Sequence, residues 1–453
     1  MVLDSTTANG GQAHLNTLSV GESRNPPGIC PCPGRCFQAL SLPVKIIASL
    51  RRPVFFLLLL AVVPQARAQI DPEPRRLLQL GYNKNIEGRG PTAGYAFFYH
   101  NQPGFPQTNL TLRIAIAPVY LDSELGIARA LGPHTDVGLG VAGGGFADSF
   151  SEVRGGKFLR EESFTGHGGG ASASLYHRFN PGQQIPLNAV LRGGVYYTTY
   201  TRDDQTAPDF ALPNNGTAFK VRAGLRFGGI EPLLLPDLAM ELSTWYEGQF
   251  RNNDGAYGVA GDRAVKADSH LFWSRALLAY TLPSEQRFFI SITAGTSANS
   301  DRFSAYRLGA ALPLASEFPL SLPGYYFQEI TASRYALFSG YYMVPLGAKK
   351  EWNVTLFAAT AAVDYLAGMQ QPGDWHSGVG AGIGYRPHNK IWQVNLGYAY
   401  GIDAIRKDDR GAQSIGLLLQ YDLETRRRQK PAAAPDANLG PNRWNFLRNF
   451  FGF

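Results

Sequence analysis

Three cysteines are the first side chains in this sequence that could bind a metal or act as nucleophiles. They lie close together near the start of the chain, at Cys30, Cys32 and Cys36 in the segment CPCPGRC. Structural zinc sites use four ligands at fuller spacing, and the nearest histidine is His14. We therefore predict neither a metal site nor a cofactor in this segment.

The segment GLGVAG, Gly138–Gly143, matches the glycine pattern of dinucleotide-binding loops. That pattern indicates a cofactor site only where it follows a strand and opens a helix. Here the next residues are GGFADSFSEVRGG, which lack helical periodicity. We therefore interpret these glycines as residues that relieve crowding within a strand.

Histidine and serine side chains could form the nucleophile–base pair of a lipid-hydrolysing enzyme. The histidines after residue 68 are scattered, at His100, His134, His167, His177, His270, His376 and His388. His270 and Ser274 share one face of a predicted strand, but the strand rise separates them by roughly 13 Å. The sequence therefore favours a protein that is not an enzyme, and a lipid-modifying enzyme is the second alternative function.

A set of charged residues in the middle of the chain alternates with apolar residues, so these charges point to the opposite face of their strands. They are Arg192, Lys220, Arg222, Arg226, Glu241, Glu247 and Arg275. Charges inside a membrane protein are tolerated where water or an opposite charge meets them, which predicts a wet interior. We favour a lattice of ion pairs that braces the wall, and a selective pore lining is the alternative.

Long alternating strands are the elements that would position these charges. In QSIGLLLQYDL, Gln413–Leu423, apolar residues such as Ile415 and Leu417 share one parity, and polar or small residues such as Gln420 mostly take the other. Because successive strand side chains point to opposite faces, one face is apolar and the other polar. The same alternation recurs at 109–118, 187–201, 217–229 and 390–402.

Three features favour a transmembrane barrel over a soluble sandwich, which has the same period. The predicted strands run to about ten residues or more, whereas globular strands average about 5–6. Aromatic residues cluster at strand ends, as in VYYTTY and LPGYYF, and such girdles mark membrane interfaces. The other face is charged and glycine-rich. Since open sheet edges do not occur in lipid, we predict an all-β fold that closes into a transmembrane antiparallel β-barrel.

We predict about sixteen strands, and fourteen is the alternative because the first three are weakly patterned. An even number is expected of a single-chain bacterial barrel. The predicted strands span residues 93–99, 109–118, 122–131, 134–150, 164–179, 187–201, 217–229, 237–250, 268–282, 287–297, 302–311, 327–343, 351–364, 376–387, 390–402 and 412–424. Long connections, such as 201–216 and 252–268, are expected outside the cell, and short turns, such as 386–389, in the periplasm.

The most apolar stretch, Val54–Val63, is too short to span a membrane. It follows two arginines and precedes Ala66-Arg67-Ala68, which is typical of a cleaved secretory signal peptide. We therefore predict the following organisation: a non-native, disordered extension at 1–43, a signal peptide at 44–68, a short periplasmic lead-in at 69–92, the outer-membrane barrel at 93–424, and a basic Pro/Ala linker with an aromatic end at 425–453.

The net charge of +7 comes from the flanks, because residues 69–425 hold 30 basic and 32 acidic side chains. Nucleic-acid binding needs a concentrated basic face, so no nucleic-acid partner is predicted. An outer-membrane barrel would contact lipid and lipopolysaccharide, and the barrel assembly machinery would insert it during biogenesis. The C-terminal segment RWNFLRNFFGF fits an interfacial helix that could meet a periplasmic partner.

Several motifs in the last third of the chain carry a family resemblance. They are Arg307-Leu308-Gly309, Pro323-Gly324-Tyr325, the glycine-rich hairpin Gly378–Gly401 and the last strand, Gln413–Leu423. This region resembles the bacterial surface antigen superfamily of outer-membrane barrels, which insert or translocate proteins. The resemblance implies an inward loop near 314–326 and a role in protein or lipid assembly or translocation. We expect that loop to contact the charged wall near Arg192, Lys220, Arg222 and Arg226.

The sequence departs from that family in two ways. The family's loop usually carries an arginine immediately before the glycine-aromatic pair, whereas Pro323 stands here, so the contact made by that arginine does not carry over. The family's insertases also carry polypeptide-transport-associated domains before the barrel, and residues 69–92 leave no room for one. The resemblance therefore implies a barrel-only member, and a diffusion porin is the alternative function.

Overall fold

The computed structural model of the chain describes residues 73–429, with gaps at 92, 118–119, 146–149, 184, 230–237, 311–317 and 408. The predicted signal peptide, the cysteine cluster and the aromatic C-terminal end lie outside these residues. The described part is almost entirely strand, with one short helix, α2 (Leu423–Gln429). Among the described residues, no helix has the length and apolar character needed to cross a membrane.

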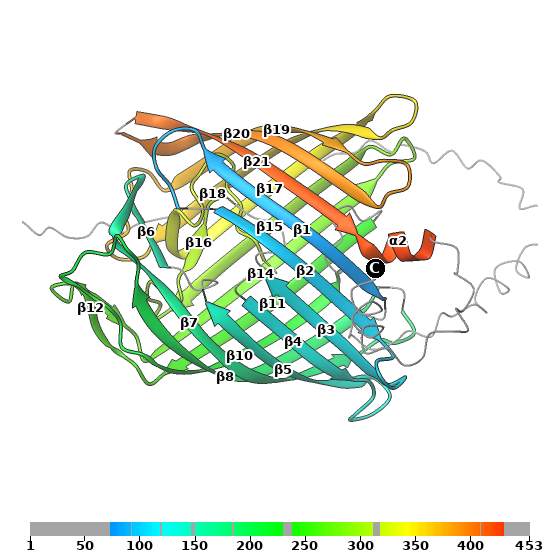
Figure 1. The fold of residues 1–453 in the computed structure, drawn as a ribbon, viewed down its shortest axis with the longest axis horizontal. Coiled ribbons are helices and arrows are strands. Elements are labelled where there is room, and N and C mark those ends of the chain that lie inside the picture. Colours follow the sequence, from blue (N-terminus) through cyan, green and yellow to red (C-terminus); the bar gives the residue numbers. More distant parts are fainter. Residues whose placement is uncertain are drawn as a thin grey trace, which may run out of the picture. The chain divides into compact units, whose positions relative to one another are not determined.

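Sixteen strands form the wall of a closed antiparallel barrel, which confirms the predicted fold (Figure 1). They are β1 (Arg75–Asn85), β2 (Ala93–Pro103), β3 (Leu110–Ala117), β4 (Tyr120–Ile127), β5 (Thr135–Gly145), β7 (Lys157–Arg178), β8 (Leu187–Arg202), β10 (Gly216–Gly228), β11 (Leu238–Arg251), β14 (Asp268–Thr281), β15 (Arg287–Ala298), β17 (Ile330–Leu346), β18 (Trp352–Tyr365), β19 (Trp375–Tyr385), β20 (Trp392–Arg406) and β21 (Asp409–Asp422). Each strand pairs with the next one named. β21 pairs with β1 from Leu77 opposite Asp422 to Asn85 opposite Ser414, which closes the sheet.

The wall strands alternate as their sequences predict. Leu191, Leu396 and Leu417 keep about half of their surface exposed on the outer face. On the inner face, Gln79 is fully buried, and its amide donates a hydrogen bond to Gln420 at 3.0 Å. An apolar outer face around a polar interior is the pattern of a membrane barrel.

This orientation predicts opposite tolerance at two positions of β21. Leu417→Arg places a charge on the lipid-facing side in mid-strand and should cost about 2–4 kcal/mol, whereas Gln420→Arg adds a charge to the wet lumen and should be mild. The yield of folded, heat-modifiable protein measures both. Equal losses for the two variants would reject the assignment of inner and outer faces.

Two strand predictions were wrong, and they offset each other in the total. The stretch expected as a lead-in, 69–92, contains β1, because Leu78, Leu80 and Tyr82 alternate outward like any other wall strand. The predicted strand 302–311 is not part of the wall. Only β16 (Tyr306–Leu308) forms there, and Leu308 is fully buried.

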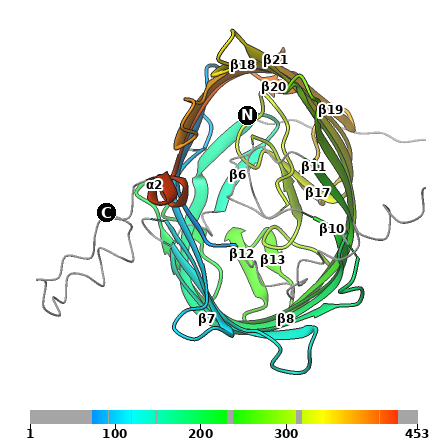
Figure 2. The same cartoon turned by 90° about the vertical axis from the view of Figure 1, so that its right-hand side faces the viewer.

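The two ends of the barrel differ in their connections (Figures 1 and 2). One end carries short turns, the start of β1 and α2. The other end carries the long connections, which contain five further strands: β6 (Phe150–Arg154), β9 (Phe210–Ala211), β12 (Gly255–Val259), β13 (Arg263–Val265) and β16. Since long loops face outside in bacterial barrels, we call this end the outer mouth.

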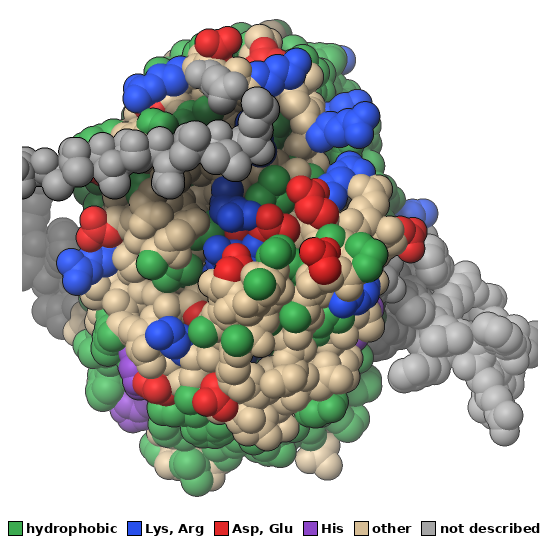
Figure 3. All heavy atoms as spheres, turned by 90° about the vertical axis from the view of Figure 1, so that its left-hand side faces the viewer, with side chains coloured by type: hydrophobic (Ala, Val, Ile, Leu, Met, Phe, Trp, Pro, Cys, Tyr) green, Lys and Arg blue, Asp and Glu red, His purple; other side chains and the backbone are tan. Residues whose placement is uncertain are grey.

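A buried aromatic cluster packs the connections of the outer mouth together. Phe164, Phe210 and Tyr257 are each 3% exposed or less, and Phe303 packs against them. Charged side chains of both signs gather at the centre of this end (Figure 3). In the connections of this end, Glu152 pairs with the Arg302 guanidinium at 2.6 Å. The outer mouth is therefore a folded layer with its own core.

Candidate functional site in the barrel lumen

Residues 318–329, which lead into β17, lie inside the ring of strands (Figure 2). The amide of Leu322 donates to the carbonyl of Gly309 at 2.7 Å, and the amide of Ala310 donates to the carbonyl of Tyr326 at 3.0 Å. Gly309 also forms a parallel bridge with Ser321. We call residues 318–329 the lumenal loop. Its own backbone hydrogen bonds and those to Gly309 and Ala310 define its shape.

The tip of the lumenal loop lies against β19 and β20. Gly324 has a φ of +84°, and a Cβ added there would collide with the backbone of Gly401. A Cβ at Gly378 would likewise collide with the carbonyl of Pro323. These three glycines therefore allow the loop backbone to touch the wall backbone directly, which no residue with a side chain would permit.

Tyr325 anchors the tip beside a buried histidine. Its side chain is fully buried, and its hydroxyl lies 3.2 Å from Nδ1 of His376 on β19. The other ring nitrogen of His376 lies 2.5 Å from the hydroxyl of Tyr365 on β18. Burial raises the pKa of Tyr325, so the phenol stays neutral. The three side chains form a connected polar network across the loop, β18 and β19.

A buried ion pair fastens the base of the lumenal loop to β20. Glu329 accepts hydrogen bonds from both terminal nitrogens of Arg406, at 2.7 and 2.9 Å, and their side chains are 0% and 5% exposed. The amide of Tyr326 donates to the same carboxylate at 2.7 Å. The Arg406 guanidinium also lies 3.5 Å from the centre of the Tyr326 ring. Bidentate pairs of this kind are strong and geometrically specific.

The predicted lumenal charges pair with one another along the opposite wall. Glu241 accepts a hydrogen bond from Arg275 at 2.6 Å, and the Arg226 guanidinium lies 3.7 Å away. Glu247 accepts from Arg222 at 2.6 Å. The ammonium group of Lys220 lies over the ring of Tyr196, 5.3 Å from its centre. Three arginines of the predicted set are thus paired with its two glutamates, and its lysine meets an aromatic ring.

Arg192 belongs to a cluster whose centre the sequence analysis missed. Its partner is Glu124 on β4, which is 4% exposed and also lies 3.6 Å from Arg113. Ser174 and Tyr176 donate hydrogen bonds to the same carboxylate, at 3.0 and 2.8 Å. Arg113 alternates with apolar residues along its strand. This alternation is a sequence signal that could have added Arg113 to the predicted lumenal charges.

The expected contact between the loop and the charged wall is only partly right. Phe318, at the start of the lumenal loop, packs 4.5 Å from the Arg275 guanidinium and 5.9 Å from that of Arg226. Its ring also meets Trp245 and Trp273. The tip, Pro323-Gly324-Tyr325, lies instead against β19 and β20. The glycines there admit it, whereas the charged wall is filled by its own ion pairs.

The histidine and serine that were considered as a catalytic pair, His270 and Ser274, have other hydrogen-bond partners. Nδ1 of His270 lies 2.9 Å from the hydroxyl of Tyr246, and Ser274 donates to Thr244 at 3.1 Å. In the part of the chain that the structure describes, no cluster of His, Cys, Asp or Glu has the makings of a metal site. The lumen therefore contains a wall of paired charges and a loop that is held in place by contacts with the wall.

No family model matches the sequence, and no curated protein matches it. Solved structures do. CdiB from Acinetobacter baumannii aligns with a TM-score of 0.50 at 10% identity, over 77% of this chain and 60% of that one. BamA from Haemophilus ducreyi lacking POTRA domains 1-3 aligns with the same TM-score and identity, over 76% and 70%.

The chain has the fold of outer-membrane barrels. At 10% identity the two alignments show the fold alone, and the chain spans about three fifths of the CdiB chain. A further match, to the OccK11 (OpdR) protein of Pseudomonas aeruginosa, has a TM-score of only 0.33.

The close approach at the loop tip predicts a contrast between two glycines. Gly324→Ala meets both a positive φ and the Gly401 backbone, whereas Gly347, with a φ of +74°, has nothing within 4 Å of an added Cβ. Both variants should lose about 1–2 kcal/mol from the backbone conformation, and Gly324→Ala should lose a further 1–3 kcal/mol or so from overpacking. Urea unfolding measures both. Equal losses would mean that the tip does not bear on the wall.

Proposed function

We propose that this chain is a non-enzymatic outer-membrane barrel of the surface-antigen type, which assists the assembly or translocation of proteins or lipids. One observation carries the proposal: the lumenal loop contacts two separate parts of the wall. It is fixed to β20 by Glu329–Arg406 and by Gly324 against Gly401, and its Phe318 packs on Trp245 and Trp273 of β11 and β14, so it crosses the lumen. A loop fixed in this way narrows the path that a small solute could take through the barrel. The fold shared with CdiB and BamA supports the same role.

The proposed partners follow from this setting. The apolar outer wall would lie in lipid and lipopolysaccharide, the barrel assembly machinery would insert the chain, and a cleaved signal peptide would export it. The C-terminal segment, which lies outside the described residues, would bind a periplasmic partner.

A diffusion porin is the second candidate, and the charged wall favours it. Arg113 and Arg222 keep 32% and 36% of their side chains exposed to the lumen, as groups that meet a passing solute would. A lipid-modifying enzyme is the third. The two residues considered for its nucleophile–base pair, His270 and Ser274, bond to Tyr246 and Thr244 instead.

Depletion of the protein in its own bacterium tests these alternatives together. The proposal expects a loss of folded, heat-modifiable outer-membrane proteins, of a secreted protein, or of surface lipopolysaccharide, with small-solute uptake unchanged. Reduced uptake with normal assembly would establish the porin instead. An altered lipid chemistry with both processes intact would establish the enzyme.

A further inference from the structure

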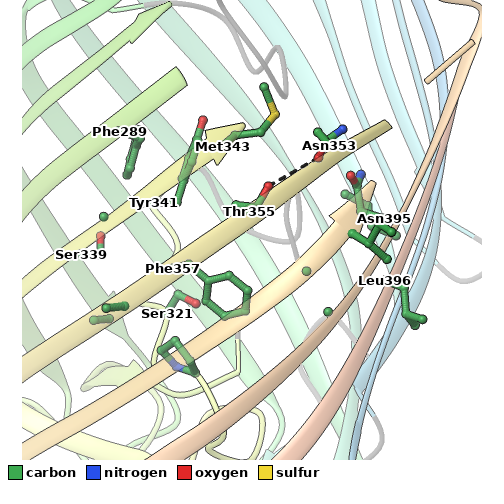
Figure 4. Close-up of a pocket in the computed structure, with 18 of the residues that line it drawn as sticks. Phe289, Ser321, Ser339, Tyr341, Met343, Asn353, Thr355, Phe357, Asn395 and Leu396 are labelled. Atoms are coloured by element: carbon green, nitrogen blue, oxygen red, sulfur yellow. Dashed lines mark hydrogen bonds between the residues drawn. The ribbon is translucent and has the colours of Figure 1, made fainter. Parts of the chain in front are cut away.

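The lumen contains a cavity of about 410 Å³ beside the lumenal loop (Figure 4). Its inner surface comes from β15 and from β17 to β21, and Ser321 and Pro323 of the loop border it. Cavities of roughly 300–1,000 Å³ are the size that proteins use for small ligands. The cavity is therefore large enough to be a binding site.

The lining of this cavity is aromatic and apolar, with neutral polar groups. Phe289, Tyr341 and Phe357 provide three rings from three strands, and Met343 and Leu418 add flexible apolar surface. Among the residues that the structure describes, no Asp, Glu, Lys, Arg or His lines it. This composition contrasts with the opposite wall, where arginines and glutamates alternate. A ligand with a net charge would lose its hydration there without gaining a partner.

Glycines and amides shape the polar side of the cavity. Across three paired strands, Asn353 and Asn395 stand on either side of Gly384. Both side chains come so close to Gly384 that a Cβ there would touch them. Gly382 and Gly397, also paired, leave the neighbouring wall without side chains. Two neutral amides therefore meet over a bare stretch of wall and can donate or accept hydrogen bonds.

The cavity lies toward the end of the barrel that carries the short turns. Asn353 follows the turn after β17, and Met343 precedes it by a few residues. The lumenal loop covers the side toward the outer mouth. Arg287 stands opposite Met343 in the sheet register but does not line the cavity. A ligand would therefore enter from the short-turn end, past Arg287.

We propose that this cavity binds an uncharged amphiphile of small-molecule size. Its apolar body would lie on Tyr341 and Phe357, and a neutral hydrogen-bonding group would meet the amides of Asn353 and Asn395. The proposal concerns a different part of the lumen from the ion pair that carries the proposed function, and it stands whether the barrel assembles proteins or conducts solutes.

Photolabelling of the full chain in lipid nanodiscs tests this site. Benzophenone is uncharged, fits the cavity and inserts into nearby C–H bonds on illumination, and 4-benzoylbenzoate is its anionic counterpart. We expect benzophenone adducts at Met343, Tyr341 or Leu418. Excess diphenylmethanol should reduce them about tenfold, and the anionic probe should give few. Adducts confined to lipid-facing residues that do not line the cavity, such as Leu356 and Leu417, or equal labelling by the anionic probe, would overturn the proposal.

Two matched substitutions sharpen this test. Ser339→Phe fills the cavity from β17, whereas Leu356→Phe places the same ring on the lipid face of β18, at a residue that does not line the cavity. Lumenal labelling should fall about tenfold in the first and stay unchanged in the second. Unchanged labelling in Ser339→Phe would contradict the site. If that variant does not fold, the competition by diphenylmethanol in the unaltered chain still decides the question.

Discussion

Deleting the loop tip, Pro319–Tyr325, is expected to turn a nearly silent barrel into one with large, steady openings in a planar lipid bilayer. Leu322 and Tyr325 are fully buried in the lumen, where they join a cluster that includes Trp245 and Trp273. A sixteen-strand barrel leaves an aqueous channel when nothing fills it. Single-channel conductance therefore reports directly on whether this loop is what closes the lumen.

The outer mouth supplies the matched control for that deletion. Removing Tyr257–Arg263 takes away a segment of the same length from the hairpin of β12 and β13, including one ring of the aromatic cluster. The lumenal loop would be untouched, so conductance should stay low. The opposite result, with openings after the mouth deletion and none after the loop deletion, would show that the outer layer is the seal.

The ion pair at the base of the loop carries the second large effect. Arg406→Met should cost about 3–5 kcal/mol of folding free energy, because it leaves the buried carboxylate of Glu329 without its cation. The variant should also show flickering openings as the loop loosens. Urea unfolding measures the first effect and bilayer recording the second.

Two control variants distinguish the effect of losing this ion pair from a nonspecific loss of stability. Arg334→Met breaks an exposed pair with Asp364, whose side chains are 68% and 66% exposed, and should cost no more than about 1 kcal/mol. The double variant Glu329→Leu with Arg406→Met should recover most of the lost stability, since apolar pairs often replace buried ion pairs without loss. If Arg406→Met costs no more than Arg334→Met, Glu329–Arg406 does not hold the loop.

The alternation of apolar and polar residues made most of the wall strands predictable from the sequence. Side chains such as Leu417 and Arg222 differ so strongly in their cost in lipid that only one face can be outside. The same argument failed at Tyr306 and Leu308, which alternate like a wall strand. Their apolar side chains pack inside the barrel. A two-residue period shows that one face of a strand is apolar, but it does not show whether that face meets lipid or the protein interior. β1 carries the same alternation, at Leu78, Leu80 and Tyr82, and it was missed because its stretch was assigned to the lead-in before the barrel.

The means of holding the loop could not be predicted from the sequence. The resemblance led us to look for an arginine on the loop, where Pro323 stands. In the structure the loop supplies the acid, Glu329, and the wall supplies the arginine, Arg406. These residues lie 77 positions apart in the chain, and only the path of the strands brings them together. A local motif therefore identified the loop and missed its partner.

Cysteine labelling at Ser321 tests the inward loop most directly. If the signal peptide is cleaved as predicted, the mature chain contains no native thiol. Ser321→Cys on intact cells should then react slowly or not at all with a bulky, membrane-impermeant maleimide. Ala260→Cys, on the exposed turn between β12 and β13, should react rapidly. Rapid labelling at both positions would place the loop outside the barrel and contradict the closed lumen.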